Sequence, residues 1–255
     1  MFTPPAYLSP SSINTYRECP QKFKFSRIDG LKEPPTWHTH LGTFVHEVLE
    51  HFYQIDAADR SLDSARTLAT ERWREGAWED QVKALLKPVG SITEFKQAAF
   101  ECISNLWKVE DPQQTEIDGM EHEVLADVDG VAMKGYIDRF IFDNDGKVVI
   151  SDYKTGKVPN PRFTTEDEKF FQLLAYALML EAADQEETSR VQLLYLKMGT
   201  THEVTVTPVK LAIARGVIVE TKEAIDDACA KGSFECNVTK LCDWCHFKPI
   251  CPAHS

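Results

Sequence analysis

Asp152 and Lys154 close an apolar run, in the sequence VISDYKTG of residues 149–156. Side chains in a β-strand alternate between its two faces, so these two side chains are expected to point the same way. The carboxylate can then hold a divalent cation while the ammonium reaches a group bound to the same ion. An isolated Asp-x-Lys triplet is more often a simple ion pair at a strand end, so the surrounding residues must decide its meaning.

Further candidate ligands lie before and after this strand. The sequence GYIDR places Asp138 near the end of the preceding strand, and a hairpin would bring it beside Asp152. Two neighbouring carboxylates repel each other unless a cation lies between them. His46 lies in the helical pattern GTFVHE, and Gln172 and Tyr176 share one face of a later helix. Taken singly, such a histidine and such a helical pair most often serve packing.

The residue types indicate a particular metal chemistry. Carboxylates with one imidazole suit Mg²⁺ or Mn²⁺ and not a structural zinc ion. Hydrolysis of a phosphodiester needs a hydroxide near neutral pH and compensation for the charge on the phosphoryl oxygens. A bound divalent cation supplies both, and a lysine beside it adds a fixed positive charge. Whether one or two cations act stays open at this point.

The elements that must position these residues follow from apolar periodicity and turn signals. Asp129-Gly130 and Asp145-Gly146 predict two tight turns between strands. Strands are expected over residues 121–128, 131–142, 147–154, 191–198 and 203–207. Helices are expected over residues 9–18, 41–54, 61–80, 91–109, 165–183 and 208–230. This order predicts an α/β fold with a central sheet flanked by helices.

The bulk properties limit the class of protein. Residues 55–115 show helical patterns without a strand signal, so we interpret them as a helical insertion in a single domain of residues 1–255. The net charge of −12 argues against nonspecific coating of nucleic acid, but carboxylates that bind metal ions are compatible with an enzyme acting on DNA. The absence of a signal pattern and of an apolar stretch of 18 residues predicts a cytoplasmic protein without a membrane partner.

Seven cysteines suggest a second site. An odd count argues against a disulfide framework, and three of the cysteines have the spacing Cys242-x2-Cys245-x5-Cys251. That spacing suggests metal ligation, and the early Cys19 could complete a set of four. By spacing alone, such a set describes a structural zinc site as well as an iron–sulfur cluster.

The motifs GTFVH, GYIDR, DYKTG and Gln172-x3-Tyr176 follow one another in an order typical of one nuclease family. Together they make residues 8–252 resemble the RecB-like branch of the PD-(D/E)XK nuclease superfamily, with the helical insertion least covered. The resemblance implies a restriction-endonuclease-like core with a mixed sheet. It implies that Lys154 orients or activates water, and that Gln172 and Tyr176 support the site or touch the substrate. The ligands it implies for Mg²⁺ or Mn²⁺ are His46, Asp138, Asp152 and the backbone carbonyl of Tyr153.

The same resemblance implies a [4Fe–4S] cluster, as in AddB-type nuclease domains and CRISPR-associated RecB-like nucleases. Residues 236–255 would then form a cysteine-rich segment that pairs with Cys19 and joins the two ends of the chain. The implied ligands are Cys19, Cys242, Cys245 and Cys251. The cysteines expected outside the ligand set are Cys102, Cys229 and Cys236, of which the last could compete with Cys242.

The function implied by the resemblance is that of a DNA exonuclease favouring single strands, in DNA repair or recombination. One alternative is a CRISPR adaptation nuclease that trims DNA before spacer integration by a partner, and another is a DNA-binding module without catalysis. The sequence contains no GxxxxGK[ST] phosphate loop, so unwinding of duplexes would need a helicase partner. The basic residues that could contact DNA are Arg17, Lys22, Lys24, Arg139, Lys240 and Lys248.

Overall fold

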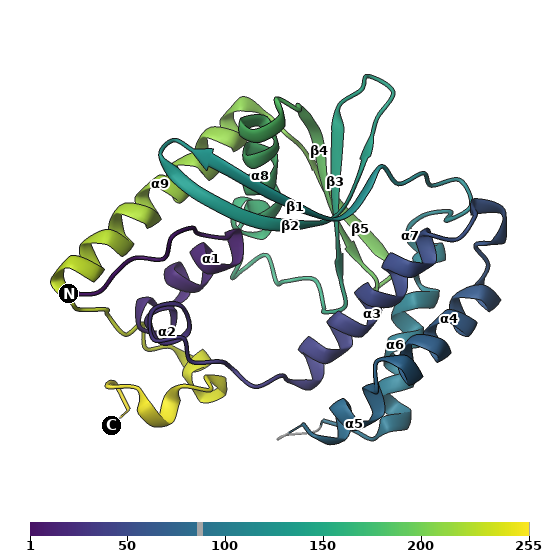
Figure 1. Ribbon diagram of the computed structural model, residues 1–255, viewed down its shortest axis with the longest axis horizontal. Helices are drawn as coiled ribbons and strands as arrows, with labels where there is room; N and C mark the ends of the chain where they lie inside the picture. The colour runs from purple at the N-terminus through teal and green to yellow at the C-terminus, as the bar shows by residue number, and fades with distance from the viewer. Residues whose placement is uncertain (86–88, 255) are drawn as a thin grey trace.

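The computed structural model describes residues 1–85 and 89–254. Its centre is a five-stranded sheet in the sequential order β1-β2-β3-β4-β5 (Figure 1). β3 and β4 pair in parallel and the other neighbours are antiparallel, which confirms a mixed sheet within an α/β fold. The strands are β1 (Gly119–Val128), β2 (Val131–Phe142), β3 (Val148–Lys154), β4 (Thr188–Tyr195) and β5 (Thr200–Thr205).

The connections between strands follow from their sequences. Asp129 and Gly130, between β1 and β2, have φ values of 52° and 82°, as a tight two-residue hairpin requires. Gly146 and Gly199 provide the positive φ needed in the β2–β3 and β4–β5 turns. The parallel β3–β4 pair needs a longer crossover, and α8 (Glu166–Asp184) provides it.

One face of the sheet packs against helices from both ends of the chain (Figure 1). α8 lies on the strands, and α9 (Pro208–Lys231) and α1 (Pro10–Glu18) pack on α8. Ser9 caps α1, with Pro10 at its first position, because the Ser9 hydroxyl accepts the Ser12 backbone N–H. α2 (Pro20–Phe23) and a π-helical turn (Lys24–Ile28) follow α1 and complete this side.

The opposite face carries a second group of helices, which we call the helical layer. Edge-to-face contacts of Phe44 with Trp73 and Trp78 hold its helices together. Tyr153 of β3 and Leu194 of β4 belong to the same buried cluster, so this layer packs directly on the sheet. The helices of the layer are α3 (Trp37–Tyr53), a 3₁₀ turn (Ala57–Asp59), α4 (Leu62–Glu75), α5 (Trp78–Lys83), α6 (Ile92–Ser104) and α7 (Leu106–Val109).

Several element boundaries differ from the sequence expectation, and two of them have a clear structural reason. The helix expected over residues 61–80 ends at Glu75, because the chain turns at Ala77 with a φ of 50°. The Trp78 indole donates to the Glu47 carboxylate at 3.0 Å and anchors α5 in its new direction. The strand expected to reach residue 198 ends at Tyr195, where the turn to β5 begins. Residues 86–88, inside the expected insertion, and residue 255 lie outside the described part.

The C-terminal segment returns to the N-terminal helices, and Figure 1 shows its yellow trace beside α2. The Gln21 backbone N–H donates to the Glu235 carbonyl at 3.0 Å, and the Asn237 amide donates to the Glu18 carbonyl at 2.9 Å. Two 3₁₀ turns, Lys240–Trp244 and Lys248–Ile250, follow. Within the described residues, no helix is long and apolar enough to cross a membrane.

Candidate metal centre and cysteine pocket

Three elements bring the candidate metal ligands together at one end of the sheet. His46 projects from α3, Asp138 from β2 and Tyr153 from β3. The His46 Nδ1 atom lies 3.4 Å from Asp138 Oδ2, and its Nε2 atom lies 2.9 Å from the Tyr153 carbonyl oxygen. The Tyr153 backbone N–H donates to Asp138 Oδ2 at 3.1 Å. One imidazole, one carboxylate and one backbone carbonyl therefore converge at this end of the sheet.

Asp152 and Lys154 complete this centre from the end of β3. The Lys154 Nζ atom lies 2.6 Å from Asp152 Oδ2, so the alternation of strand side chains places the pair together. From α8, the Gln172 amide donates to Asp152 Oδ1 at 3.4 Å and to the Tyr176 hydroxyl at 3.5 Å. Tyr176 also explains Gly135 of β2, because a Cβ atom there would lie 2.5 Å from the tyrosine ring.

The electrostatics of the centre fit a bound divalent cation. Burial, followed by repulsion from Asp152, raises the pKa of Asp138 above its ordinary value. Asp152 is 3% exposed, and its Oδ2 atom has no hydrogen bond of suitable geometry despite the nearby lysine. A buried carboxylate beside a partly buried one is costly, and a bound cation would add to the positive charge that Lys154 supplies. Hard oxygen ligands with one imidazole would suit Mg²⁺ or Mn²⁺.

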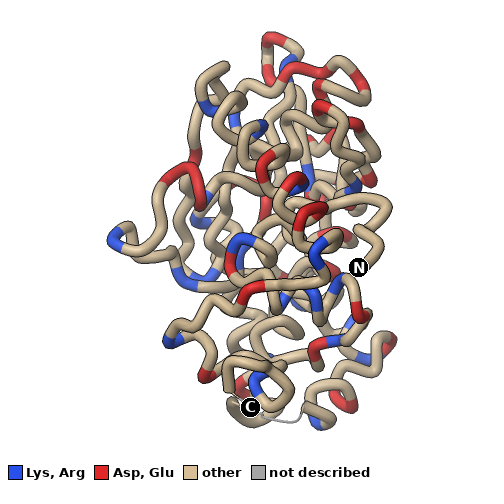
Figure 2. The backbone as a smooth tube through the Cα atoms, turned by 90° about the vertical axis from the view of Figure 1, so that its left-hand side faces the viewer, with Lys and Arg blue, Asp and Glu red and all other residues tan. Residues whose placement is uncertain are grey.

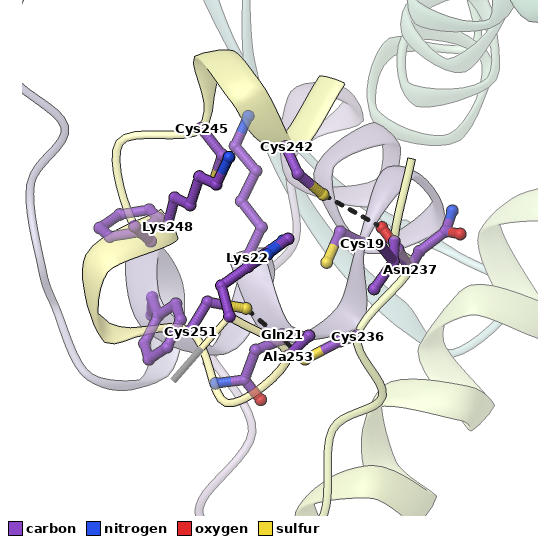
Figure 3. Close-up of a pocket in the computed structure, with 14 residues that line it drawn as sticks. Cys19, Gln21, Lys22, Cys236, Asn237, Cys242, Cys245, Lys248, Cys251 and Ala253 are labelled. Carbon is purple, nitrogen blue, oxygen red and sulfur yellow. Dashed lines mark hydrogen bonds between the residues drawn. The ribbon is translucent and has the colours of Figure 1, made fainter. Parts of the chain in front are cut away.

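A second pocket gathers five of the seven cysteines (Figure 3). Cys19 comes from the junction of α1 and α2, and the others come from the C-terminal segment. The Cys242 sulfur accepts the Thr239 backbone N–H at 3.4 Å. The cysteines that line the pocket are Cys19, Cys236, Cys242, Cys245 and Cys251. The four expected ligands therefore share one pocket, and Cys236, expected to stand apart, lies there too.

The spacing of these sulfurs bears on the kind of metal group. Two thiolates on one tetrahedral zinc ion, each about 2.3 Å from it, lie about 3.8 Å apart. Within residues 1–85 and 89–254, no three cysteine sulfurs lie within 4.8 Å of one another. The described cysteines therefore share a pocket without forming a compact set of three ligands.

A sequence model of the PD-(D/E)XK nuclease superfamily matches residues 7–252. The chain belongs to the PD-(D/E)XK nuclease superfamily. Nucleases of this superfamily typically use divalent metals, in agreement with the acidic centre described above.

The curated relatives of this chain include the Gene 69 proteins of two mycobacteriophages. That of Mycobacterium phage L5 is 25% identical over 208 residues, covering 67% of this chain and 69% of the phage protein. That of phage D29 is 27% identical over 191 residues, covering 67% of each.

A solved structure supports the same fold. The crystal structure of a protein from Eubacterium rectale, provisionally named an exonuclease, superposes with a TM-score of 0.60. The sequences are 14% identical, and the match covers 94% of this chain and 86% of the other. At this identity the likeness concerns the fold, and it extends over the helical layer as well as the sheet.

Glu121 is a further candidate ligand of this nuclease that sequence reasoning missed. Its carboxylate can bring an oxygen within 4.8 Å of ligand atoms of both His46 and Asp138. The β1–β2 register passes from Met120↔Arg139 to His122↔Ile137, so Glu121 lies opposite Asp138. Its φ of 45° reorients the side chain relative to a regular strand. The sequence shows only an acidic residue near the start of β1. No residue type there predicts the positive φ that turns this side chain toward the site.

Replacing Glu121 with glutamine should weaken metal binding without unfolding the nuclease. The amide keeps the shape of the side chain but removes a negative charge beside the cation. We expect the Mn²⁺ concentration for half-maximal cleavage to rise about tenfold, the scale seen when groups supporting a metal site are lost. A titration of cleavage rate against Mn²⁺ measures this, and saturating Mn²⁺ should restore most of the rate.

Glu123 provides the matched control for this substitution. It also lies on β1, but its carboxylate binds the Tyr136 hydroxyl at 2.5 Å and pairs with Lys134 at 3.0 Å. The Glu123→Gln variant should therefore keep the wild-type metal dependence. Equal metal affinity in the Glu121→Gln variant and the wild type would remove Glu121 from the ligand set.

The structure corrects the expected role of Arg139 as a DNA contact. Arg139 is 2% exposed, so its guanidinium cannot reach a phosphate on the surface. Its two terminal nitrogens bind the Glu110 carboxylate at 2.7 and 2.6 Å, and one also donates to the Tyr153 hydroxyl at 2.9 Å. Arg139 is thus a buried support for the strand residue whose carbonyl faces His46.

The other basic candidates for DNA contact differ in whether an acidic side chain already pairs with them. Lys22 pairs with Glu18 and Glu33, and Lys24 pairs with Asp29. Lys248 pairs with Asp243 at 2.7 Å, whereas Arg17 and Lys240 are exposed. Figure 2 shows basic and acidic residues interspersed along the backbone on the side of the molecule where both chain ends lie. Contacts of these residues with DNA remain a prediction.

Proposed function

We propose that this nuclease is a Mg²⁺- or Mn²⁺-dependent DNA exonuclease that degrades single strands. The observation that carries the proposal is the convergence of His46, Asp138, Asp152 and Lys154 at one end of the sheet. His46, Asp138, Asp152 and the Tyr153 carbonyl would hold the cation, and Glu121 lies within reach of it. A cation bound there supplies a water of lowered pKa and a Lewis acid for the phosphate.

The protein residues around the cation supply positioning and charge. Gln172 holds Asp152 from α8, which keeps the carboxylate aimed at the site instead of at solvent. The Lys154 ammonium, which pairs with Asp152 in this structure, can stabilise the negative charge that develops on the phosphoryl oxygens. Because this positive charge is fixed before the substrate arrives, little reorganisation is needed during the reaction.

The choice of single-stranded DNA rests on charge and on the absence of a motor motif. The sequence has no GxxxxGK[ST] phosphate loop, and its net charge is −12. Such a chain has no evident means of opening a duplex by itself. We therefore place it in DNA repair or recombination, where a separate helicase would supply the strand. The provisional name of the Eubacterium rectale structure supports exonucleolytic cleavage.

Single-stranded DNA should be degraded at least about tenfold faster than a blunt duplex of the same sequence, and binding should weaken as salt rises. End-labelled and internally labelled strands, incubated with Mn²⁺ and with EDTA, measure rate, metal dependence and exonucleolytic order together. The EDTA arm should show no cleavage. Equal rates on both substrates, or a preference for RNA, would contradict the substrate assignment but not the metal site.

We also infer that the cysteine pocket holds a [4Fe–4S] cluster. The support is the convergence of the four expected cysteines from residue 19 and residues 242–251 in one pocket. Bound there, a cluster would join the first and last helical segments, outside the metal centre. Closing a loop of that length stabilises a fold by about 5 kcal/mol in the chain-entropy treatment. A structural role is sufficient for it.

Protein purified without oxygen should be brown, absorb at about 400 nm and contain about four irons per chain. The Cys242→Ser variant should lose iron and unfold at a lower temperature, whereas Asp152→Ala should keep its colour. Cys102→Ser and Cys229→Ser serve as controls, because both cysteines are buried elsewhere. Stoichiometric zinc without visible absorption would overturn the cluster and leave the nuclease assignment standing, because no cysteine enters the proposed chemistry.

A further inference from the structure

Cys236 makes the cysteine pocket one thiol richer than a cubane cluster requires. Its Sγ atom lies 3.7 Å from the Sγ atom of Cys251, and both residues line the pocket. Figure 3 shows the two sulfurs facing each other below Cys19 and Cys242. Each iron of a [4Fe–4S] cluster takes one thiolate from the protein, so four cysteines suffice. With five cysteines in the pocket, one is surplus.

The distance between Cys236 and Cys251 identifies which two thiols are interchangeable. Two thiolates bound to one tetrahedral metal ion lie about 3.8 Å apart, close to the spacing of this pair. An iron ion bound to the Cys251 sulfur would therefore also be within bonding distance of the Cys236 sulfur. Of the five cysteines, Cys251 is thus the one that Cys236 is placed to replace.

The backbone around both residues permits such an exchange. Cys236 lies in the irregular segment 233–239, after α9 and before the 3₁₀ turn Lys240–Trp244. Cys251 follows the turn Lys248–Ile250 and has an extended backbone conformation. Both cysteines thus lie in loop segments outside the helices and strands, although the Cys251 backbone also bonds to Lys248 and His254. Asn237 meanwhile anchors the first segment to α1 through the Glu18 carbonyl.

We propose that Cys236 is an exchange ligand that can take the place of Cys251 on the cluster. The proposal rests on the cluster inferred under the proposed function. In the exchange, the Cys236 thiol gives up its proton and binds iron, while the Cys251 thiolate leaves the iron and takes up a proton. No electron is transferred, so the step needs neither oxidant nor reductant. The cluster thereby tolerates the loss of one particular ligand.

The test compares iron and acid-labile sulfide in five anaerobically purified full-length proteins. They are the wild type, Cys236→Ser, Cys251→Ser, the double variant and Cys242→Ser. Both single variants of the exchange pair should keep most of the wild-type iron and the absorption at about 400 nm. The double variant and Cys242→Ser should each hold at most about one tenth of the wild-type iron. The double variant has no spare thiol, and in Cys242→Ser the spare Cys236 faces Cys251 and not the empty position.

Alkylation of the native proteins gives a second readout that does not depend on the yield of iron. Iodoacetamide followed by peptide mass analysis should label Cys236 in the wild type and leave Cys236 protected in Cys251→Ser. Equal loss of iron in Cys251→Ser and the double variant, or labelling of Cys236 in both proteins, would overturn the exchange. Loss of iron in Cys236→Ser alone would make Cys236 an obligatory ligand and also overturn it. A wild type without iron would overturn the cluster itself together with this proposal.

Discussion

The Asp152→Ala variant should have no measurable metal-dependent nuclease activity, a loss of about 10³-fold or more. Asp152 is buried beside Asp138 and Lys154, and Gln172 holds it toward the site. Its removal takes away a ligand for the cation and the partner that positions the lysine. The rate of release of labelled nucleotides from single-stranded DNA in Mn²⁺ measures the loss.

Lys154→Ala is the companion variant, and it should lose activity to a similar degree while still binding Mn²⁺. Both variants should keep the circular dichroism and thermal unfolding of the wild type, because neither side chain belongs to the two hydrophobic cores. Asp145→Ala, in the exposed β2–β3 turn, is the control that should retain full activity. Near-normal cleavage by Lys154→Ala would mean that the assigned centre is not the catalytic one.

The Arg139→Met variant should be the most destabilised of the substitutions outside the hydrophobic cores. The Arg139 and Glu110 side chains are 3% and 12% exposed, and they form a two-nitrogen contact. Removing one partner of a buried ion pair costs about 3–5 kcal/mol, because the remaining charge is left without compensation. Denaturant unfolding followed by circular dichroism measures the change in the free energy of unfolding.

Two further variants isolate the buried pair. Adding Glu110→Gln to Arg139→Met should recover part of the lost stability, since the uncompensated carboxylate is then gone. Arg66→Met removes a partner of the exposed Arg66–Asp63 pair and should change stability by less than about 1 kcal/mol. A loss in Arg139→Met no larger than in Arg66→Met would show that the buried pair contributes little.

The parts of the fold and the site that depend on local sequence could be predicted. Asp152 and Lys154 lie together because strand side chains alternate, and Asp129-Gly130 forms the hairpin that the residues favour. The mixed sheet flanked by helices also followed from the order of elements. The contact between His46 and the Tyr153 carbonyl needed the family resemblance, because helical periodicity does not say where α3 docks.

The missed features depend on backbone strain or on tertiary contacts. Glu121 approaches Asp138 because a non-glycine residue adopts a positive φ, which no local preference predicts. Arg139 was expected to contact DNA, yet it is 2% exposed and pairs with Glu110 from a distant part of the chain. Cys236 shares the pocket because residues 233–239 return to Cys19, a path set by hydrogen bonds to α1 and α2.

The candidate metal ligands come from elements that are held by two different hydrophobic cores. Asp138 and Asp152 belong to strands, whereas His46 belongs to α3, which is held by the packing of the helical layer. Cooperative units of a protein can open separately, and hydrogen exchange reports the free energy of each opening. Opening of the helical layer would withdraw the imidazole and leave both carboxylates in place. Cavity-forming substitutions at Trp73 or Phe95, in the core of that layer, would therefore lower metal affinity without touching the metal centre.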